Sequence, residues 1–227
     1  MTSPTADQKS FLEFLTGAGA LHFGSFTLKS GRESPYFFNA GYFCTGPLLE
    51  RAGDFYARAV EQVAPRATVV FGPAYKGVPL CVATAMALSR RTGREIGFLF
   101  DRKEAKSHGD AGNFVGMLPG PQDRLVLVDD VITDGKTKME AVAQLRATFS
   151  APIDGLVIAF DRMERSMSGS DAVEDFHAAT GIPVTSIVTL RHLEQWLAAG
   201  EGPKGMPSRL PEEIRRYQEQ YGVTGRK

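Results

Sequence analysis

The fold is decided by residues 126–137, VLVDDVITDGKT. The apolar, β-branched start of this stretch ends at two adjacent carboxylates, Asp129 and Asp130, and the segment after its glycine repeats apolar residues at helical spacing. This order predicts a buried strand, a short loop and a helix. A helix start offers free backbone N–H groups to a phosphate, and two carboxylates at a strand end can take ribose hydroxyls or a metal ion. The stretch is therefore suited to binding a ribose phosphate.

The same stretch differs from two common phosphate-binding loops, because it contains neither G-x-x-x-x-G-K-[ST] nor G-x-G-x-x-G. Its hydrophobic run, two acids and loop with threonine and glycine resemble the phosphoribosyl pyrophosphate (PRPP) signature of the type I phosphoribosyltransferases. The plain alternative is a strand end whose Asp pair only caps the next helix. The resemblance implies that Asp130 also acts in catalysis and that PRPP is bound by Asp129, Asp130, Val131, Ile132, Thr133, Asp134, Gly135, Lys136 and Thr137.

The loop departs from the family pattern at one position. The family usually has a small hydroxyl residue after the glycine, whereas here Lys136 follows Gly135 and Thr137 comes next. The backbone donors remain, so phosphate binding is expected to persist. Which side chain reaches the 5′-phosphate is left open, and Asp134 adds a negative charge without an assigned role.

Strand and helix patterns alternate on both sides of this stretch. Strands are expected at 68–71, 96–100, 153–162 and 182–190, and helices at 46–64, 78–91, 170–181 and 191–200. Before them lie a helix at 7–17, with Asp7 as a possible N-cap, and a hairpin of strands at 21–28 and 36–43. The alternation predicts an α/β fold with a mostly parallel sheet flanked by helices.

The chain is predicted to be one domain, residues 1–227, with the fold of the type I phosphoribosyltransferases. A small hood of helix plus hairpin occupies mainly residues 1–45, the core about 46–199, and a connector and helix 200–227. We assign no chemistry to that last part.

A second junction of strand, loop and helix occurs at residues 72–80, GPAYKGVPL. GPAYKG resembles the pyrophosphate loop of the orotate phosphoribosyltransferases. The resemblance implies that Tyr75 and Lys76 contact PRPP, and that the bond between Ala74 and Tyr75 is strained or cis, which is costly for a non-proline residue.

The hairpin contains TLKSGRESPYFFN, residues 27–39. Phe37 and Phe38 are consecutive, so on a strand they point to opposite faces and cannot both enter one core. The segment resembles one in orotate phosphoribosyltransferases that covers the pyrimidine. The resemblance implies that Lys29 contacts PRPP, and that Phe37 and Phe38, with Thr133, bind orotate; plain core packing is the alternative for the paired phenylalanines.

The most unusual polar stretch is DRKEAKSHGDAGNFVG, residues 101–116. Four side chains that can carry positive charge, at Arg102, Lys103, Lys106 and His108, repel one another, and the glycines make ordering costly, which predicts a loop that orders on a polyanion. An ordinary solvated loop is the alternative. RKEAKSHG resembles the catalytic loop of the orotate enzymes, which implies that all four residues contact PRPP, with Lys103, Lys106 and His108 catalytic. In that family the loop, here about 102–113, commonly completes the neighbour's site in a homodimer.

Arg162 ends a predicted strand, as Asp129 and Asp130 end theirs, so all three are expected at the same crevice. The resemblance implies that Arg162 pairs with the carboxylate of orotate, a task that suits its bidentate, permanently charged guanidinium. A surface ion pair is the alternative.

The implied activity is Mg²⁺-dependent transfer of the 5-phosphoribosyl group from PRPP to orotate, giving orotidine 5′-phosphate and pyrophosphate in pyrimidine (UMP) biosynthesis. Mg²⁺ is expected to bind through the substrate rather than in a protein cage, with Asp129 and Asp130 as candidate contacts. Two alternatives remain open: a phosphoribosyltransferase for another base, and a non-catalytic PRPP-sensing regulator.

Composition narrows the other possibilities. Lys plus Arg and Asp plus Glu are 26 each, so no net charge attracts the chain to nucleic acid or to an anionic membrane. Cys44 and Cys81 are too few for a disulfide framework and are predicted to be buried thiols. The N-terminus lacks a signal-peptide pattern and no apolar run approaches about 20 residues, so a soluble, cytoplasmic protein is expected.

Overall fold

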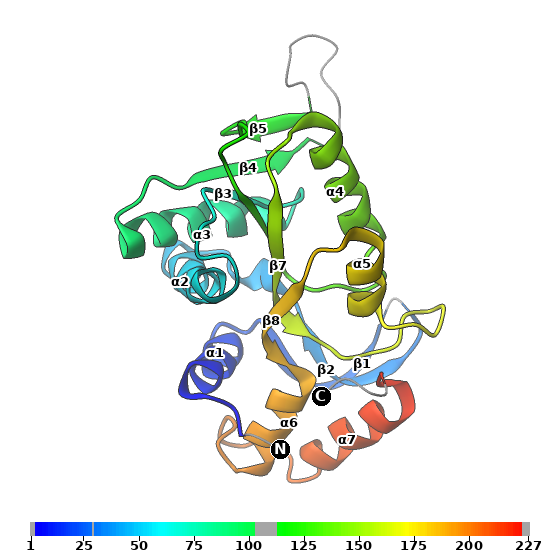
Figure 1. Cartoon of the computed structure of the whole chain (residues 1–227). Coiled ribbons are helices and arrows are strands. Elements are labelled where there is room, and N and C mark those ends of the chain that lie inside the picture. Colours follow the sequence, from blue (N-terminus) through cyan, green and yellow to red (C-terminus); the bar gives the residue numbers. More distant parts are fainter. Residues whose placement is uncertain (1–2, 29, 103–112, 224–227) are drawn as a thin grey trace.

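The computed structural model describes residues 3–28, 30–102 and 113–223 (Figure 1). Its centre is a six-stranded sheet in the order β5-β4-β3-β6-β7-β8. Neighbouring strands run parallel except β5, which is antiparallel to β4 at one edge. The predicted mostly parallel sheet is thus confirmed. The strands are β3 (Val69–Phe71), β4 (Gly97–Asp101), β5 (Phe114–Gly116), β6 (Leu125–Asp129), β7 (Ile153–Asp161) and β8 (Val184–Thr189).

Side chains alternate across this sheet and form two separate cores. On β6, Val126 and Val128 enter one core while Leu125 and Leu127 enter the other. Helices cover both faces of the sheet, so residues 125–128 of β6 are apolar whichever face they point to. In Figure 1, α2 (Gly46–Val63) and α3 (Gly77–Thr92) lie on one side of the sheet, and α4 (Lys136–Thr148) and α5 (Ala172–Thr180) on the other.

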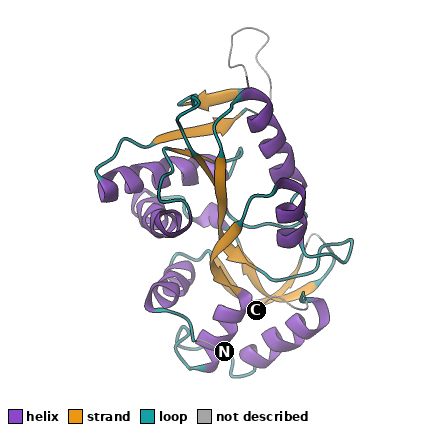
Figure 2. Cartoon of the chain, in the orientation of Figure 1, coloured by secondary structure: helices purple, strands orange, loops and turns teal. Residues whose placement is uncertain are grey.

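The N-terminal helix and hairpin contribute side chains to the first core. Helix α1 (Ala6–Gly17) buries Phe11, Leu12, Phe14 and Leu15, and β1 (Leu21–Thr27) pairs antiparallel with β2 (Glu33–Phe38) in a sheet of their own. Helices α6 (Leu190–Ala198) and α7 (Leu210–Tyr221) complete this lower half of the molecule, where α7 packs against β2 (Figure 2). Residues from the two ends of the chain therefore meet.

Several local predictions were wrong. The second hairpin strand was expected at 36–43, but β2 ends at Phe38 and a 3₁₀ turn (Ala40–Tyr42) follows. Helix α1 is capped by Thr5 rather than Asp7, because Thr5 and Gln8 form a reciprocal capping box. The edge strand β5 was missed within a segment interpreted as loop. Cys81 is buried, as predicted, but Cys44 is exposed.

No helix within residues 3–28, 30–102 and 113–223 is both long enough and apolar enough to cross a lipid bilayer.

Candidate active site

A cavity of about 540 Å³ opens beside the carboxyl ends of the parallel strands β6 and β7. This is the edge at which open α/β sheets bind ligands. Several residues predicted to bind substrate line the cavity together, although they come from the hairpin, the loop after β3, the loop after β6 and the segment after β7: Phe37, Phe38, Lys76, Ile132, Thr133 and Arg162.

The two carboxylates at the end of β6 are nearly buried, and each is paired with a lysine. Lys76 Nζ lies 2.9 Å from Asp130 Oδ2, and Lys138 Nζ lies 2.6 Å from Asp129 Oδ2. Burial raises the pKa of Asp129, and the charge of Lys138 opposes that rise. Sequence reasoning gave Lys138 no role, because nothing in its helical position marks it as a partner of Asp129.

The strand end that carries these carboxylates is held from two sides. Tyr56 of α2 donates its hydroxyl to the backbone oxygen of Asp129 at 2.7 Å. The backbone N–H groups of Ala159 and Phe160 on β7 donate to the backbone oxygen of Asp130 at 3.0 and 3.3 Å. These contacts fix the position of Asp129 and Asp130, where the chain leaves the sheet and enters the loop after β6.

The loop after β6 presents a row of exposed polar groups. Thr133, Asp134, Lys136 and Thr137 are exposed, while Ile132 anchors the loop in the second core. Gly135 has a φ of 72°, a left-handed conformation that suits glycine. Asp134 Oδ1 accepts the backbone N–H of Lys136 at 3.1 Å, so this carboxylate occupies one of the donors at the start of α4. The sequence assigned no role to Asp134; in the structure, its side chain accepts a hydrogen bond at the start of α4.

The loop after β3 contains the cis bond between Ala74 and Tyr75 that the family resemblance implied. Asp101 Oδ1 accepts the backbone N–H of Ala74 at 2.6 Å, which ties this loop to the end of β4. Tyr75 is 75% exposed. The loop closes tightly, because a Cβ on Gly72 would lie only 2.1 Å from the backbone oxygen of Gly77.

Phe37 and Phe38 diverge, as their neighbouring positions on one strand predict. The Phe38 ring packs toward the first core, with its centroid 5.6 Å from that of Phe160. The Phe37 ring is 36% exposed and lies 5.7 Å from the ring of Phe26 on β1. Both residues line the cavity, so plain core packing does not account for the pair.

Arg162 lies just beyond β7, which ends at Asp161 rather than at Arg162 as predicted. Its guanidinium pairs with Glu164 at 2.7 Å, and the side chain is 24% exposed. Burial alone would lower the pKa of Arg162, but Tyr36 and Glu164 outweigh this effect and raise it. The ion pair of the alternative interpretation thus exists, but it lies at the cavity rather than on the open surface.

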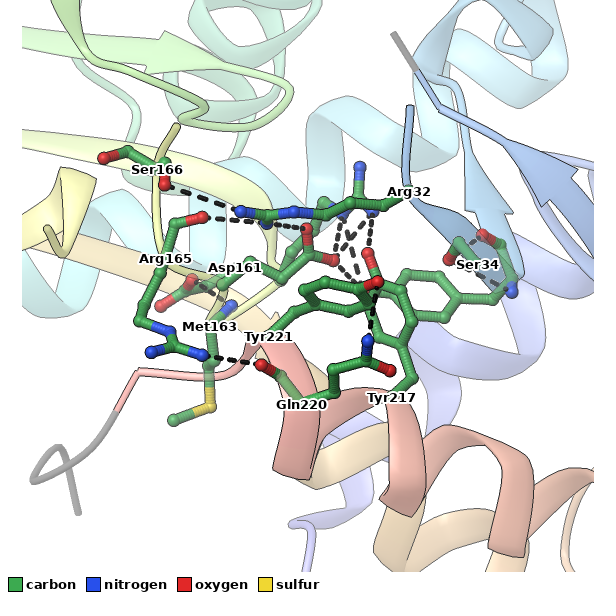
Figure 3. Close-up of polar contacts among 12 residues, drawn as sticks. Arg32, Ser34, Asp161, Met163, Arg165, Ser166, Tyr217, Gln220 and Tyr221 are labelled. Atoms are coloured by element: carbon green, nitrogen blue, oxygen red, sulfur yellow. Dashed lines mark hydrogen bonds and ion pairs between the residues drawn. The ribbon is translucent and has the colours of Figure 1, made fainter. Parts of the chain in front are cut away.

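Three residues around Arg162 were missed by sequence reasoning. Arg32 and Glu164 line the cavity, and Tyr217 of α7 contacts Arg162 (Figure 3 shows this surrounding network). Arg32 lies within residues 27–39, and Glu164 is two residues after Arg162. Because both residues are charged and close to predicted site residues, the sequence could have indicated them. Tyr217 offered only its helical spacing.

Four predicted site residues lie outside the described residues: Lys29, Lys103, Lys106 and His108. Arg102, which precedes three of them, is exposed, and its backbone N–H donates to the backbone oxygen of Asn113 at 2.7 Å. Strands β4 and β5 therefore hold the two ends of segment 103–112 side by side.

Among residues 3–28, 30–102 and 113–223, no three His, Cys, Asp or Glu side chains form a group that could hold a metal ion. The two acids at the end of β6, Asp129 and Asp130, are already engaged by lysines. This donor set fits a hard cation that arrives with a phosphate-bearing substrate and keeps part of its water shell.

The chain is similar to known proteins over almost its whole length. A family model for the phosphoribosyl transferase domain matches residues 46–177. The orotate phosphoribosyltransferases of Methylococcus capsulatus and Pseudomonas syringae are 46% and 45% identical to it over 96% of the chain and 98% and 99% of their own lengths. The crystal structure of orotate phosphoribosyltransferase from Francisella tularensis is 32% identical, with a TM-score of 0.81, and the match covers 94% of this chain and 100% of that one.

Proposed function

The chain belongs to the phosphoribosyl transferase family and, within it, to the orotate phosphoribosyltransferases, and on that basis we propose that it transfers the 5-phosphoribosyl group of PRPP to orotate. The bond between C1′ and the pyrophosphate oxygen breaks, a bond from C1′ to the pyrimidine nitrogen forms, and the proton of that nitrogen is released to the pyrophosphate or to water. The products are orotidine 5′-phosphate and pyrophosphate, in pyrimidine biosynthesis. The observation that carries the proposal is one cavity lined by Arg162, Lys76 and Thr133, so the residue proposed to bind the orotate carboxylate lies near residues proposed to bind PRPP.

PRPP is assigned to the ends of β3 and β6. The loop from Val131 to Thr137 receives the 5′-phosphate at the start of α4, where backbone N–H groups and the helix dipole favour an anion. Asp130 and Asp129 take the ribose hydroxyls, and Tyr75 and Lys76 take the pyrophosphate. Support comes from the ion pair between Lys76 and Asp130, which places the loop after β3 within reach of the loop after β6.

Orotate is assigned to the hairpin side of the cavity. Arg162 binds its carboxylate, while Phe37, Phe38 and Thr133 enclose the ring. The half-buried position of Arg162 supports this assignment, since a charge-assisted hydrogen bond is stronger when water is largely excluded.

Catalysis is electrostatic in this proposal. As the leaving pyrophosphate gains negative charge, Arg102, Lys103, Lys106 and His108 stabilise it, with Lys103 acting most directly; Lys29 adds a further PRPP contact. These roles rest on the sequence resemblance. The junction between Arg102 and Asn113 supports them only by holding both ends of the segment at the sheet edge.

Mg²⁺ is the proposed cofactor, bound through PRPP, where it would neutralise pyrophosphate charge. Asp129 and Asp130 are the carboxylates proposed to meet it through water.

We also propose that two copies of the chain form a dimer in which segment 102–113 of one completes the site of the other. Large apolar side chains on the elements at this end of the sheet are exposed and would be covered by a second copy: Met86 on α3, Phe98 on β4, and Met117 and Leu118 after β5. These four residues are called the edge patch below.

The division into hood, core and C-terminal segment also stays a prediction, as does a cytoplasmic location. The balanced charge gives no reason to add nucleic acid or membrane as a partner.

The reaction is tested by following orotate consumption through its ultraviolet absorbance. Loss of orotate should require both PRPP and Mg²⁺, and should fall about 100-fold or more in Lys103→Ala. Lys204→Ala, an exposed lysine outside the proposed site, is the matched control and should keep wild-type activity. Turnover of adenine, hypoxanthine or uracil in place of orotate would contradict the base assignment, and PRPP binding without turnover of any base would favour the regulator.

A further inference from the structure

The guanidinium of Arg162 is held along one side only. Its Nε donates to Glu164 Oε1 at 2.9 Å and to the Tyr36 hydroxyl at 3.4 Å. Its Nη2 lies 2.7 Å from Glu164 Oε1 and donates to the Tyr217 hydroxyl at 3.4 Å. Among the described residues, Nη1 makes no hydrogen bond. The Nη1 side of the guanidinium is therefore available to a ligand in the cavity that Arg162 lines.

Glu164 is shared between two guanidinium groups. Besides Arg162, it lies 3.5 Å from Nη1 of Arg32, and it accepts the Tyr36 hydroxyl at 2.9 Å. Two arginines and one glutamate leave a net charge of +1 beside the cavity. A single additional carboxylate would balance that charge, whereas a neutral base would leave it uncompensated.

Helix α7 supplies Tyr217 and is fastened to the segment that follows Arg162. The backbone N–H of Arg165 donates to the backbone oxygen of Tyr221 at 2.9 Å, and that of Val223 donates to the backbone oxygen of Met163 at 2.9 Å. Figure 3 shows Tyr217 and Tyr221 extending from α7 into this network, with Arg165 joined to Gln220. The segment bearing Arg162 and α7 therefore form one connected unit.

The Tyr217 hydroxyl is suited to a permanent contact. Its ring packs edge-on to that of Tyr36, with centroids 5.9 Å apart and planes at 83°. Burial and the charge of Glu164 raise the pKa of Tyr217 to about 12, so the hydroxyl stays protonated at neutral pH.

We propose that α7 is part of the substrate-recognition machinery, and that Tyr217 is a positioning residue that, with Glu164, fixes the plane of the Arg162 guanidinium so that Nη1 meets the substrate carboxylate. The inference rests on the proposed function. It gives a role to a helix that lies about 50 residues beyond Arg162 in sequence and outside the matched family region, residues 46–177.

The test compares two nucleotides that differ only by the carboxylate, orotidine 5′-phosphate and uridine 5′-phosphate, by equilibrium titration of the full chain. Wild type should bind the carboxylated nucleotide more tightly. Tyr217→Phe should reduce this preference about 3- to 10-fold, the effect of one hydrogen bond of ordinary strength, and should leave the affinity for uridine 5′-phosphate unchanged. Tyr221→Phe is the matched control, because its hydroxyl contacts Gln220 and not Arg162.

Further variants show whether Tyr217 acts through Arg162. In an Arg162→Lys background, Tyr217→Phe should have no additional effect. A preference that survives Tyr217→Phe, or an effect that persists in the Arg162→Lys background, would overturn the inference while leaving the proposed function intact. A wild type without any preference for the carboxylate would overturn both.

Discussion

Lys138 Nζ lies 2.6 Å from Asp129 Oδ2, and the two side chains are only 12% and 10% exposed. The first of the two acids proposed to bind ribose is thus neutralised by a lysine of α4, the helix that follows the loop after β6. Asp130, by contrast, is paired with Lys76, whose side chain is 57% exposed and can move toward a ligand. The two adjacent acids are therefore not equivalent: of the two acids proposed to bind ribose hydroxyls, Asp130 can exchange its lysine for the ligand more readily.

Replacing Lys138 should destabilise the fold. Lys138→Met leaves the buried Asp129 without its partner, so the free energy of unfolding should fall by about 3–5 kcal/mol at pH 7, as measured by urea denaturation. Lys136→Met removes an exposed lysine from the same helical turn and should change stability by less than about 0.5 kcal/mol. Equal losses in both variants would contradict a buried ion pair.

The stability deficit of Lys138→Met should also depend on pH. Burial raises the pKa of Asp129, and without Lys138 that rise is unopposed. A raised pKa means that the folded chain binds more protons than the unfolded chain, in which Asp titrates near pH 4. The free energy of unfolding of the variant should therefore fall, relative to wild type, as the pH rises from about 4 toward 7. A deficit of the same size at every pH would show that packing, not charge, causes it.

Asp134 should compete with the 5′-phosphate. Its carboxylate occupies the backbone N–H of Lys136, so a phosphate must displace it. Asp134→Ala is expected to tighten PRPP binding about 3- to 10-fold and to lower stability by about 0.5–1 kcal/mol through loss of the contact at the helix start. Glu140→Ala removes an exposed charge from the same helix and is the control for a general charge effect. Weaker binding in Asp134→Ala would mean that Asp134 supports the loop in its binding shape.

The contact between α2 and α3 should not tolerate a methyl group at Gly53. A Cβ there would lie 2.6 Å from the backbone oxygen of Ala83. Gly53→Ala should therefore lower the free energy of unfolding by about 1–3 kcal/mol in urea denaturation. Gly46→Ala lies in the same helix with no atom within 4 Å of the added carbon, and should be neutral or slightly stabilising. Comparable losses at both positions would contradict close helix packing as the cause.

Shared active sites predict rescue between two inactive variants. If segment 102–113 acts on the neighbouring copy, mixing Lys103→Ala with Arg162→Gln should restore about a quarter of wild-type activity, because mixed dimers contain one intact site. Each variant alone supplies the baseline. Absence of rescue after demonstrated subunit exchange would mean that each chain completes its own site.

If the edge patch forms the dimer contact, a charge placed in it should prevent dimer formation and abolish the rescue of activity in mixed dimers. Phe98→Asp places a charge on the exposed apolar surface and should yield monomers in sedimentation analysis, with loss of most activity. Gln144→Glu, on the exposed face of α4, should remain a dimer. Dimers that persist in Phe98→Asp would place the contact elsewhere.

Much of the fold follows from local patterns in the sequence. The apolar residues 126–128 predict a strand covered on both faces. The glycines and lysine after Phe71 predict a second junction of strand, loop and helix at the same sheet edge. What could not be predicted depends on contacts between distant segments. Lys138 has an ordinary helical position, and Tyr217 meets Arg162 only because α7 returns to the hairpin. Neighbouring residues cannot encode such pairings, since these depend on the completed topology.

The meeting of β2, the segment after β7 and α7 has a consequence for protein engineering. Tyr36 and Tyr217 lie 181 positions apart in sequence, yet the hydroxyl groups of both accept hydrogen bonds from Arg162. A chimera that exchanged only the hairpin for that of an enzyme acting on another base would keep the original α7. The contacts of α7 with the arginine would then not match the new hairpin. Base selectivity should therefore be transplanted with both terminal regions together, and the phosphate loops can stay untouched.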